Sequence, residues 1–378
     1  MAHLLLKLKA GDIQVKKHKY CCQNRVQSYI DHMIDVPDDF SIISEKLQGL
    51  NKSDFIVGLK SLTELIKKLY ENMILDPEGF GLPCVEDIHY SPFNPKAAES
   101  GNSSYRLIMF LYVLANSGIL ENDKLIIDKK KYQETNKKQK GMFKVSNTTY
   151  IFNKLSDFGF EIENFNGKTL DKKCDNFTIS YKKHKNLITV LYGYMKDVQI
   201  QREPFMSFHY YLLSNPEDLP KNHIQNIFSE YFHGKEKDFY IELSNFLSEL
   251  NIYPKYNGYA FSIDYLANPK VKQLFIRCFS DYRKISINLK LNFIDTYTEY
   301  LSTCPENVKQ TFKIKSNCNF CQESCVCRRI WSFEGITYTF CTHSYNFEIA
   351  DYNLKYINYY KQIIKYEIEA RKNAKNKK

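Results

Sequence analysis

Five cysteines near the C-terminus have the spacing of metal ligands. They read Cys318-x2-Cys321-x3-Cys325-x-Cys327, and Cys341 follows after thirteen further residues. Two cysteines separated by two residues form a turn that presents both thiolates to one metal ion, and a second pair from elsewhere completes a tetrahedron. Because four thiolates leave no coordination position for water, such a site supports the fold rather than catalysis. The spacing therefore predicts a structural Zn²⁺ site.

A hairpin is predicted directly after this cluster. Residues 328–333 and 336–341 are two strand-like runs separated by the dipeptide Glu334-Gly335. A two-residue turn fixes the register of such a pair, with Trp331 opposite Tyr338 and the first residue of the hairpin opposite Cys341. The hairpin thus returns Cys341 to the start of the first strand.

The register also helps to select the ligands. A regular strand puts Cys327 on the opposite face from Cys341, whereas Cys325 precedes the strand and is less constrained. The predicted ligands are Cys318, Cys321, Cys325 and Cys341, with Cys327 or His343 as substitutes.

Other interpretations of the cluster stay open. An iron–sulfur cluster also takes four cysteines. A redox-active Cys-x-x-Cys would belong in a thioredoxin-like βαβ unit, which the flanking sequence does not indicate. The thiols could also carry no ligand at all. Zn²⁺ is the interpretation that the spacing favours.

The sequence contains no recognisable catalytic motif. Phosphate-binding glycine loops, the serine nucleophile elbow, the zincin helix and the dinucleotide-binding fingerprint are all missing. The nine histidines are dispersed, and single ones such as His209 and His223 are expected to be ordinary surface or core residues. The sequence thus favours a protein that is not an enzyme, although an active site assembled from distant residues remains an alternative.

The composition is that of a folded chain without a membrane span. Of the 378 residues, 43% are hydrophobic and 25% charged, and no apolar run approaches the ~20 residues of a transmembrane helix. We therefore expect a cytoplasmic protein without a membrane partner, whose eleven cysteines are thiols or metal ligands.

Positive charge is concentrated in the middle of the chain. The overall formal charge is +10, and residues 124–185 hold 15 Lys against 7 Asp and Glu, a net +8. The elements expected here are an apolar helix (105–116), a short strand (125–127), a lysine-rich second helix, a helix (146–158) and two strands (160–163 and 177–181) around Asn166-Gly167. This order resembles that of a winged helix over about 80 residues.

The resemblance implies a way to bind duplex DNA. The helix at 146–158 would be the recognition helix, with polar positions facing the major groove. These positions are Asn147, Thr148, Tyr150, Asn153 and Lys154. Phosphate contacts would come from Lys129–Lys131, Lys137, Lys138, Lys140, Lys144, Lys168, Lys172 and Lys173. Winged helices also serve as protein-binding modules, so a protein-interaction or scaffold role is the second hypothesis, and a small-molecule binder or unrecognised enzyme the third.

These elements together predict a multidomain α+β protein. We expect a helical N-terminal region (1–100), a basic winged-helix-like domain (101–200) and a helical and antiparallel-sheet domain (201–378). In the last, alternation of apolar and polar residues predicts a three-stranded meander around 259–291. The zinc-binding hairpin and a terminal helix complete it.

Overall fold

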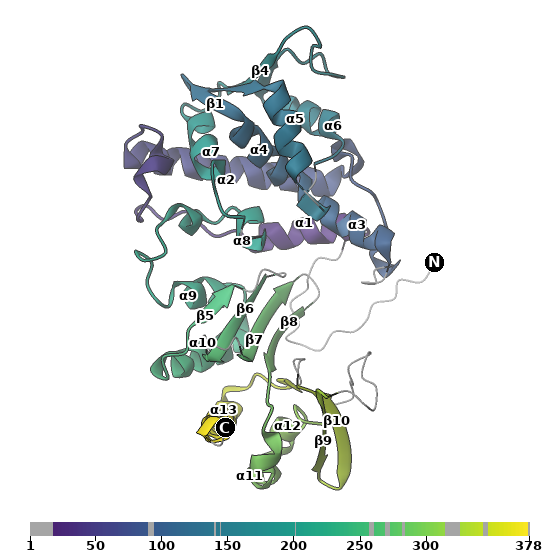
Figure 1. Cartoon of the computed structure of the whole chain (residues 1–378), viewed down its shortest axis with the longest axis vertical. Helices are drawn as coiled ribbons and strands as arrows, with labels where there is room; N and C mark the ends of the chain where they lie inside the picture. The colour runs from purple at the N-terminus through teal and green to yellow at the C-terminus, as the bar shows by residue number, and fades with distance from the viewer. Residues whose placement is uncertain are drawn as a thin grey trace. The chain divides into compact units, whose positions relative to one another are not determined.

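The chain forms two compact units that contain both helices and strands. The computed structural model describes residues 18–89, 94–139, 141–143, 145–200, 202–256, 261–268, 273–281, 284–313, 326–342 and 347–376. Residues 16–220 belong to one unit, called here the N-terminal unit, and residues 221–378 to the other, the C-terminal unit (Figure 1). The predicted mixed α+β class is confirmed. Residues of the predicted N-terminal and middle domains lie in the same unit.

Three helices open the N-terminal unit. They are α1 (Cys21–Asp31), α2 (Lys52–Leu75) and α3 (Pro95–Ser103). The N-cap of α2 is Asn51, whose side chain accepts a hydrogen bond from the Asp54 amide. Most of helix α3 lies within the predicted helical N-terminal region. Pro95 occupies its first turn, where a missing N–H costs nothing, and Asn94 caps it.

The middle of the N-terminal unit is an antiparallel sheet with helices. Its strands, β1 (Gly118–Glu121), β2 (Lys124–Asp128), β3 (Phe160–Glu163) and β4 (Asn176–Tyr181), are ordered β1-β2-β4-β3. Its helices are α4 (Arg106–Ser117), α5 (Lys129–Lys138), α6 (Thr148–Asp157) and α7 (Leu187–Met195). The predicted strands at 160–163 and 177–181 are therefore present. Strand β1 was not predicted.

Aromatic residues hold these elements together. Helix α4 is apolar on nearly all sides, as expected for a helix surrounded by protein. Phe110 of α4 packs edge-on against Phe152 of α6, with 4.8 Å between ring centroids, and Phe152 also contacts Phe177 of β4 at 5.7 Å. Phe152 is 2% exposed. The core thus fixes α6 between α4 and the sheet. The unit ends with α8 (Arg202–Met206) and a short 3₁₀ turn, η5 (Tyr210–Leu213).

The C-terminal unit contains a five-stranded antiparallel sheet ordered β11-β8-β7-β6-β5. The strands are β5 (Pro254–Tyr256), β6 (Phe261–Asn268), β7 (Gln273–Asp281), β8 (Lys284–Leu289) and β11 (Phe347–Glu348). Strands β6, β7 and β8 form the predicted meander. Helices α9 (His223–Ser229) and α10 (Gly234–Glu249) precede it, and the Tyr240 hydroxyl of α10 lies 3.1 Å from the Tyr265 hydroxyl of β6.

The predicted hairpin is formed by β9 (Arg328–Phe333) and β10 (Ile336–Cys341). The register is confirmed, with Trp331 opposite Tyr338 and Arg328 opposite Cys341. Glu334 and Gly335 have φ angles of 49° and 76°, the left-handed pair that a two-residue turn requires. The Trp331 indole donates to the Thr298 hydroxyl at 2.8 Å, which attaches the hairpin to the segment that follows β8.

Short helices and a long terminal helix complete the C-terminal unit. They are η7 (Ile294–Tyr297), α11 (Thr298–Thr303), α12 (Glu306–Lys309), η8 (Leu354–Tyr356) and α13 (Ile357–Asn376). In the part of the chain that the structure describes, no helix is long and apolar enough to span a membrane.

Candidate functional site

The loop between β3 and β4, residues 164–175, has a defined conformation. The Asn166 side chain accepts hydrogen bonds from the amides of Lys168 and Thr169 at 3.0 and 2.8 Å. Phe165 anchors the base of the loop, since its ring lies 5.0 Å from that of Phe152. The loop is therefore held on the core while most of its side chains face solvent.

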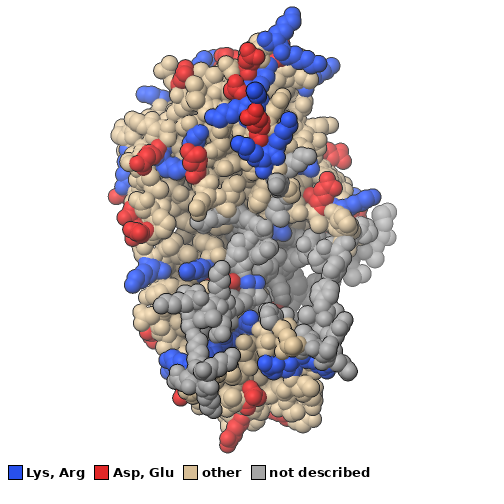
Figure 2. All heavy atoms as spheres, in the orientation of Figure 1, with Lys and Arg blue, Asp and Glu red and all other residues tan. Residues whose placement is uncertain are grey.

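This loop lies along α6 and carries exposed lysines. The Thr149 hydroxyl of α6 donates to the Lys168 carbonyl at 3.2 Å. Lys168, Lys172 and Lys173, all predicted phosphate contacts, are exposed. Figure 2 shows Lys and Arg side chains, with some Asp and Glu among them, at the end of the view where Figure 1 labels β4. The loop thus presents positive charge beside α6.

The opposite side of α6 packs against residues 76–81. Lys154 forms an ion pair with Asp76 at 2.7 Å, and this bond lowers the pKa of the Asp76 carboxyl. The Asn147 side chain donates to the Gly81 carbonyl at 2.9 Å. A Cβ on Gly81 would lie 2.8 Å from the Asn147 Cβ, so the two segments are in close contact. Two of the predicted groove-facing side chains are therefore engaged within the chain.

A narrow part of α6 stays exposed between the β3–β4 loop and residues 76–81. Tyr150 is 49% exposed and Asn153 is also exposed, whereas Thr148 is half-buried. We call Tyr150 and Asn153 the α6 strip. Asn147 is exposed as well, although its side chain donates to the Gly81 carbonyl.

The other lysines predicted to contact phosphates lie at the two ends of α5 or outside the described residues. Lys129, at the start of α5, donates to the Asp171 carbonyl of the β3–β4 loop. Lys137 and Lys138 are exposed at the other end of α5, about 12 Å along the helix axis. Lys140 and Lys144 lie outside the described residues.

The structure describes two of the six predicted metal ligands. Cys341 is 7% exposed, although alternation along β10 puts it on the opposite face from the buried Tyr338. Burial lowers the pKa of the Lys290 ammonium, and the nearby Arg371 lowers it further. Cys341 and Cys327 act in the opposite direction, because both thiols lie near this ammonium. Within the described residues no group of three metal-ligating side chains occurs. Cys318, Cys321, Cys325 and His343 lie outside them.

The two buried histidines of the N-terminal unit have structural partners. His209 Nε2 lies 2.7 Å from the His32 carbonyl and Nδ1 lies 3.0 Å from the Tyr211 hydroxyl. Burial lowers the pKa of His209 to about 4 and that of His32 to about 3. Both imidazoles are neutral near pH 7 as a result, and they serve as core residues.

A buried carboxylate fixes a turn in the C-terminal unit. Glu367 of α13 is fully buried and accepts hydrogen bonds from the amides of Asn292 and Phe293, the Tyr297 hydroxyl and Arg371 Nε, at 2.7–3.1 Å. Burial raises the pKa of this carboxyl, although Arg371 and the other donors act in the opposite direction. Four donors to one carboxylate hold residues 292–297 rigidly against α13.

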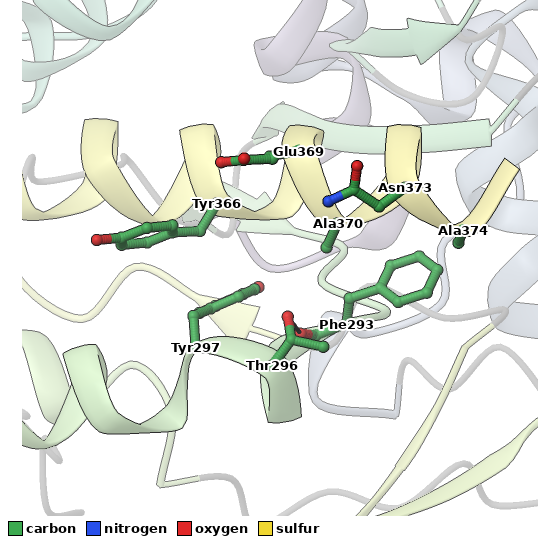
Figure 3. A pocket seen from close by; sticks show the side chains of 8 residues that line it. All are labelled: Phe293, Thr296, Tyr297, Tyr366, Glu369, Ala370, Asn373 and Ala374. Atoms are coloured by element: carbon green, nitrogen blue, oxygen red, sulfur yellow. Dashed lines mark hydrogen bonds between the residues drawn. The ribbon is translucent and has the colours of Figure 1, made fainter. Parts of the chain in front are cut away.

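Two cavities border this turn, and sequence reasoning missed both. The first, here called the helix cavity, has a volume of about 460 Å³ and lies between η7 and α13 (Figure 3). Figure 3 shows Thr296 and Phe293 facing Ala370 and Ala374, with Tyr297 and Tyr366 toward one end. The rings of Tyr297 and Tyr366 are stacked, with 5.9 Å between centroids.

The second, here called the hairpin cavity, has a volume of about 320 Å³ and lies between the turn and β9–β10. It is lined by Asn292, Phe293, Ile294, Asp295, Arg329, Ile330, Trp331, Phe340 and Thr342. No sequence signal identifies such a site, because its walls come from segments more than thirty residues apart.

Known proteins give no further guidance. No family model, no curated protein and no solved structure matches this chain. Functional inference therefore rests on the geometry of these surfaces.

Proposed function

We propose that the N-terminal unit binds duplex DNA as a winged helix, using the β3–β4 loop as the wing and the α6 strip as the part of the recognition helix that reaches the bases. The carrying observation is the arrangement of β2, β3 and β4. After α4, strand β2 is followed by α5 and α6, and then by β3 and β4, with β4 paired between β2 and β3. Apart from β1, which precedes β2 and pairs with it, a winged helix has this order of elements.

The exposed lysines of the loop support the proposal. Lys168, Lys172 and Lys173 extend from a loop that is anchored on α6 through Thr149 and Phe165. Lysine contacts to phosphates contribute affinity that is independent of sequence and decreases with salt. A rigid basic loop beside a helix is suited to holding that helix at a groove.

The division of α6 refines which residues would read the bases. Asn153 and Tyr150 are exposed, so they can contact base edges or the sugar–phosphate backbone. Asn147 and Lys154 hold residues 76–81 and therefore position the helix. On this proposal, substitution of Asn153 alters sequence preference more than substitution of Lys154 does.

Fluorescence anisotropy with a labelled duplex, measured over a range of salt concentrations, tests the proposal. The variant Lys168→Gln/Lys172→Gln/Lys173→Gln should bind more weakly and show a log–log salt slope smaller by up to about three, since each phosphate contact contributes about 0.9. The control changes three exposed lysines outside the winged-helix-like segment, Lys68, Lys96 and Lys235, to Gln. It should leave the slope nearly unchanged.

Two outcomes would count against DNA binding. One is the absence of any affinity for duplex DNA at low salt, and the other is an equal loss in the loop variant and in the control. A protein partner that co-purifies with the full chain and is retained by the loop variant would favour the scaffold function instead.

We also propose that Cys318, Cys321, Cys325 and Cys341 bind one structural Zn²⁺. The confirmed register of the hairpin and the burial of Cys341 support this ligand set. Metal analysis should find one zinc per chain, and Cys341→Ser should lose it while Cys304→Ser, a change at another buried thiol of the same unit, should not. If the analysis finds iron and acid-labile sulfide in place of zinc, the cysteines bind an iron–sulfur cluster and the zinc proposal is wrong.

A further inference from the structure

The hairpin cavity combines opposite charges, a buried acceptor and aromatic walls. We propose that it binds a free α-amino acid with a large apolar side chain. The carboxylate of the ligand binds Arg329, its ammonium group binds Asp295 and Asn292, and its side chain packs on Trp331 and Phe340. This site is in the C-terminal unit and does not depend on the proposed DNA binding.

The two charged residues of the cavity do not neutralise each other. Arg329 and Asp295 both line it, and within the described residues no ion pair joins them or engages either one. The guanidinium is held in place because its Nη1 donates to the carbonyls of Val326 and Arg328 at 3.3 and 3.1 Å. A planar guanidinium forms two parallel hydrogen bonds with a carboxylate. Opposite charges that line one small cavity complement a ligand that carries both charges.

A buried amide oxygen needs a donor in the same place. Oδ1 of Asn292 is buried and has no hydrogen-bond partner in the described part of the chain. The backbone of Asn292 is fixed, since its backbone N–H donates to the Glu367 carboxylate at 2.9 Å. Buried acceptors are normally paired, and an ammonium group offers three donors. Asn292 lines the same cavity as Asp295, so a small movement of its side chain would let one ammonium serve both residues.

Most of the remaining walls are apolar. Trp331 and Phe340 are 3% and 4% exposed, and the Trp331 indole N–H is already bonded to Thr298. These rings consequently offer apolar surface rather than donors. The volume of about 320 Å³ is near the lower end of the ~300–1,000 Å³ found for small-molecule sites. A nucleotide is disfavoured, because its phosphates would meet the Asp295 carboxylate.

Isothermal titration calorimetry with the full-length chain tests the proposal, using L-phenylalanine and L-leucine as ligands. Two analogues remove one charge each: hydrocinnamate lacks the ammonium group and phenethylamine lacks the carboxylate. We expect saturable binding of at least one amino acid, and binding about 10-fold weaker or more for both analogues. No saturable binding of either amino acid up to about 10 mM would overturn the proposal.

Variants locate the ligand. Arg329→Gln and Asp295→Asn should each weaken binding by about 10-fold or more, because each removes a charged hydrogen-bond partner. Ala370→Leu partly fills the helix cavity and should leave the affinity unchanged. Circular dichroism verifies that each variant is folded. If Ala370→Leu abolishes binding while Arg329→Gln and Asp295→Asn do not affect it, the ligand occupies the helix cavity and the proposal is wrong.

Discussion

Lowering the pH from about 7 to about 5 should destabilise the N-terminal unit through His32 and His209. Both imidazoles are fully buried, so that protonation would leave a charge in the core. His32 also lies near Arg25, whose positive charge opposes its protonation further, and a proton on His209 would act in the same direction. Folded protein therefore resists proton uptake by these side chains, whereas the unfolded chain does not.

The size of the effect follows from the pKa values. Each imidazole has an ordinary pKa of 6.5, and burial lowers it to about 3 for His32 and about 4 for His209. Between 6.5 and these folded-state values the unfolded state binds more protons, so stability falls as the pH falls. Each group lowers the free energy of unfolding by about 2 kcal/mol between about pH 7 and about pH 5, and the pair by about 4 kcal/mol.

Urea unfolding at several pH values, followed by far-UV circular dichroism, measures this loss. His209→Gln removes one titrating group, so the loss over the same pH range should decrease to about 2 kcal/mol, even though lost hydrogen bonds lower the stability at every pH. His184→Gln is the matched control, because His184 is exposed and its surroundings in the folded state are largely water. The reasoning is refuted if wild type and His209→Gln lose the same free energy.

Three further changes test the packing. Phe152→Ala should lower the free energy of unfolding of the N-terminal unit by about 3–5 kcal/mol, measured by urea unfolding, because it removes a buried ring from the core beneath α6. Glu367→Ala should cost the C-terminal unit about 3–5 kcal/mol in the same assay, since four donors lose their buried acceptor. Gly193→Ala would put a Cβ 2.1 Å from the Lys46 carbonyl oxygen and should cost about 1–3 kcal/mol, whereas Gly101→Ala has open space and should be neutral or slightly stabilising in thermal denaturation.

Local sequence patterns predicted individual elements well. The hairpin of β9 and β10 has the predicted strands and register, because alternation and a two-residue turn are properties of adjacent residues. The limits of α6 differ from the prediction by two residues at the start and one at the end. Helix α3 begins at Pro95, and a proline in a sequence is compatible either with a loop or with the first turn of a helix.

The candidate interface could be predicted only in part. The lysines of the β3–β4 loop are exposed as expected, since a charged turn between two strands has little else to contact. The partners of Lys154 and Asn147 could not be foreseen. Residues 76–81 precede α6 by more than sixty positions, and no periodicity indicates that they pack against it.

The sequence by itself determined most of the helices and strands, the concentration of positive charge and the cysteine spacing, because these depend on neighbouring residues. Tertiary structure decided which part of α6 is exposed, how His209 is buried and where the hairpin cavity forms. Arg329 and Asp295 line one cavity only because β9 folds back against the turn that Glu367 holds. Contacts of this kind depend on the packing of segments that are far apart in the sequence. They leave no regular spacing of residues from which they could be predicted.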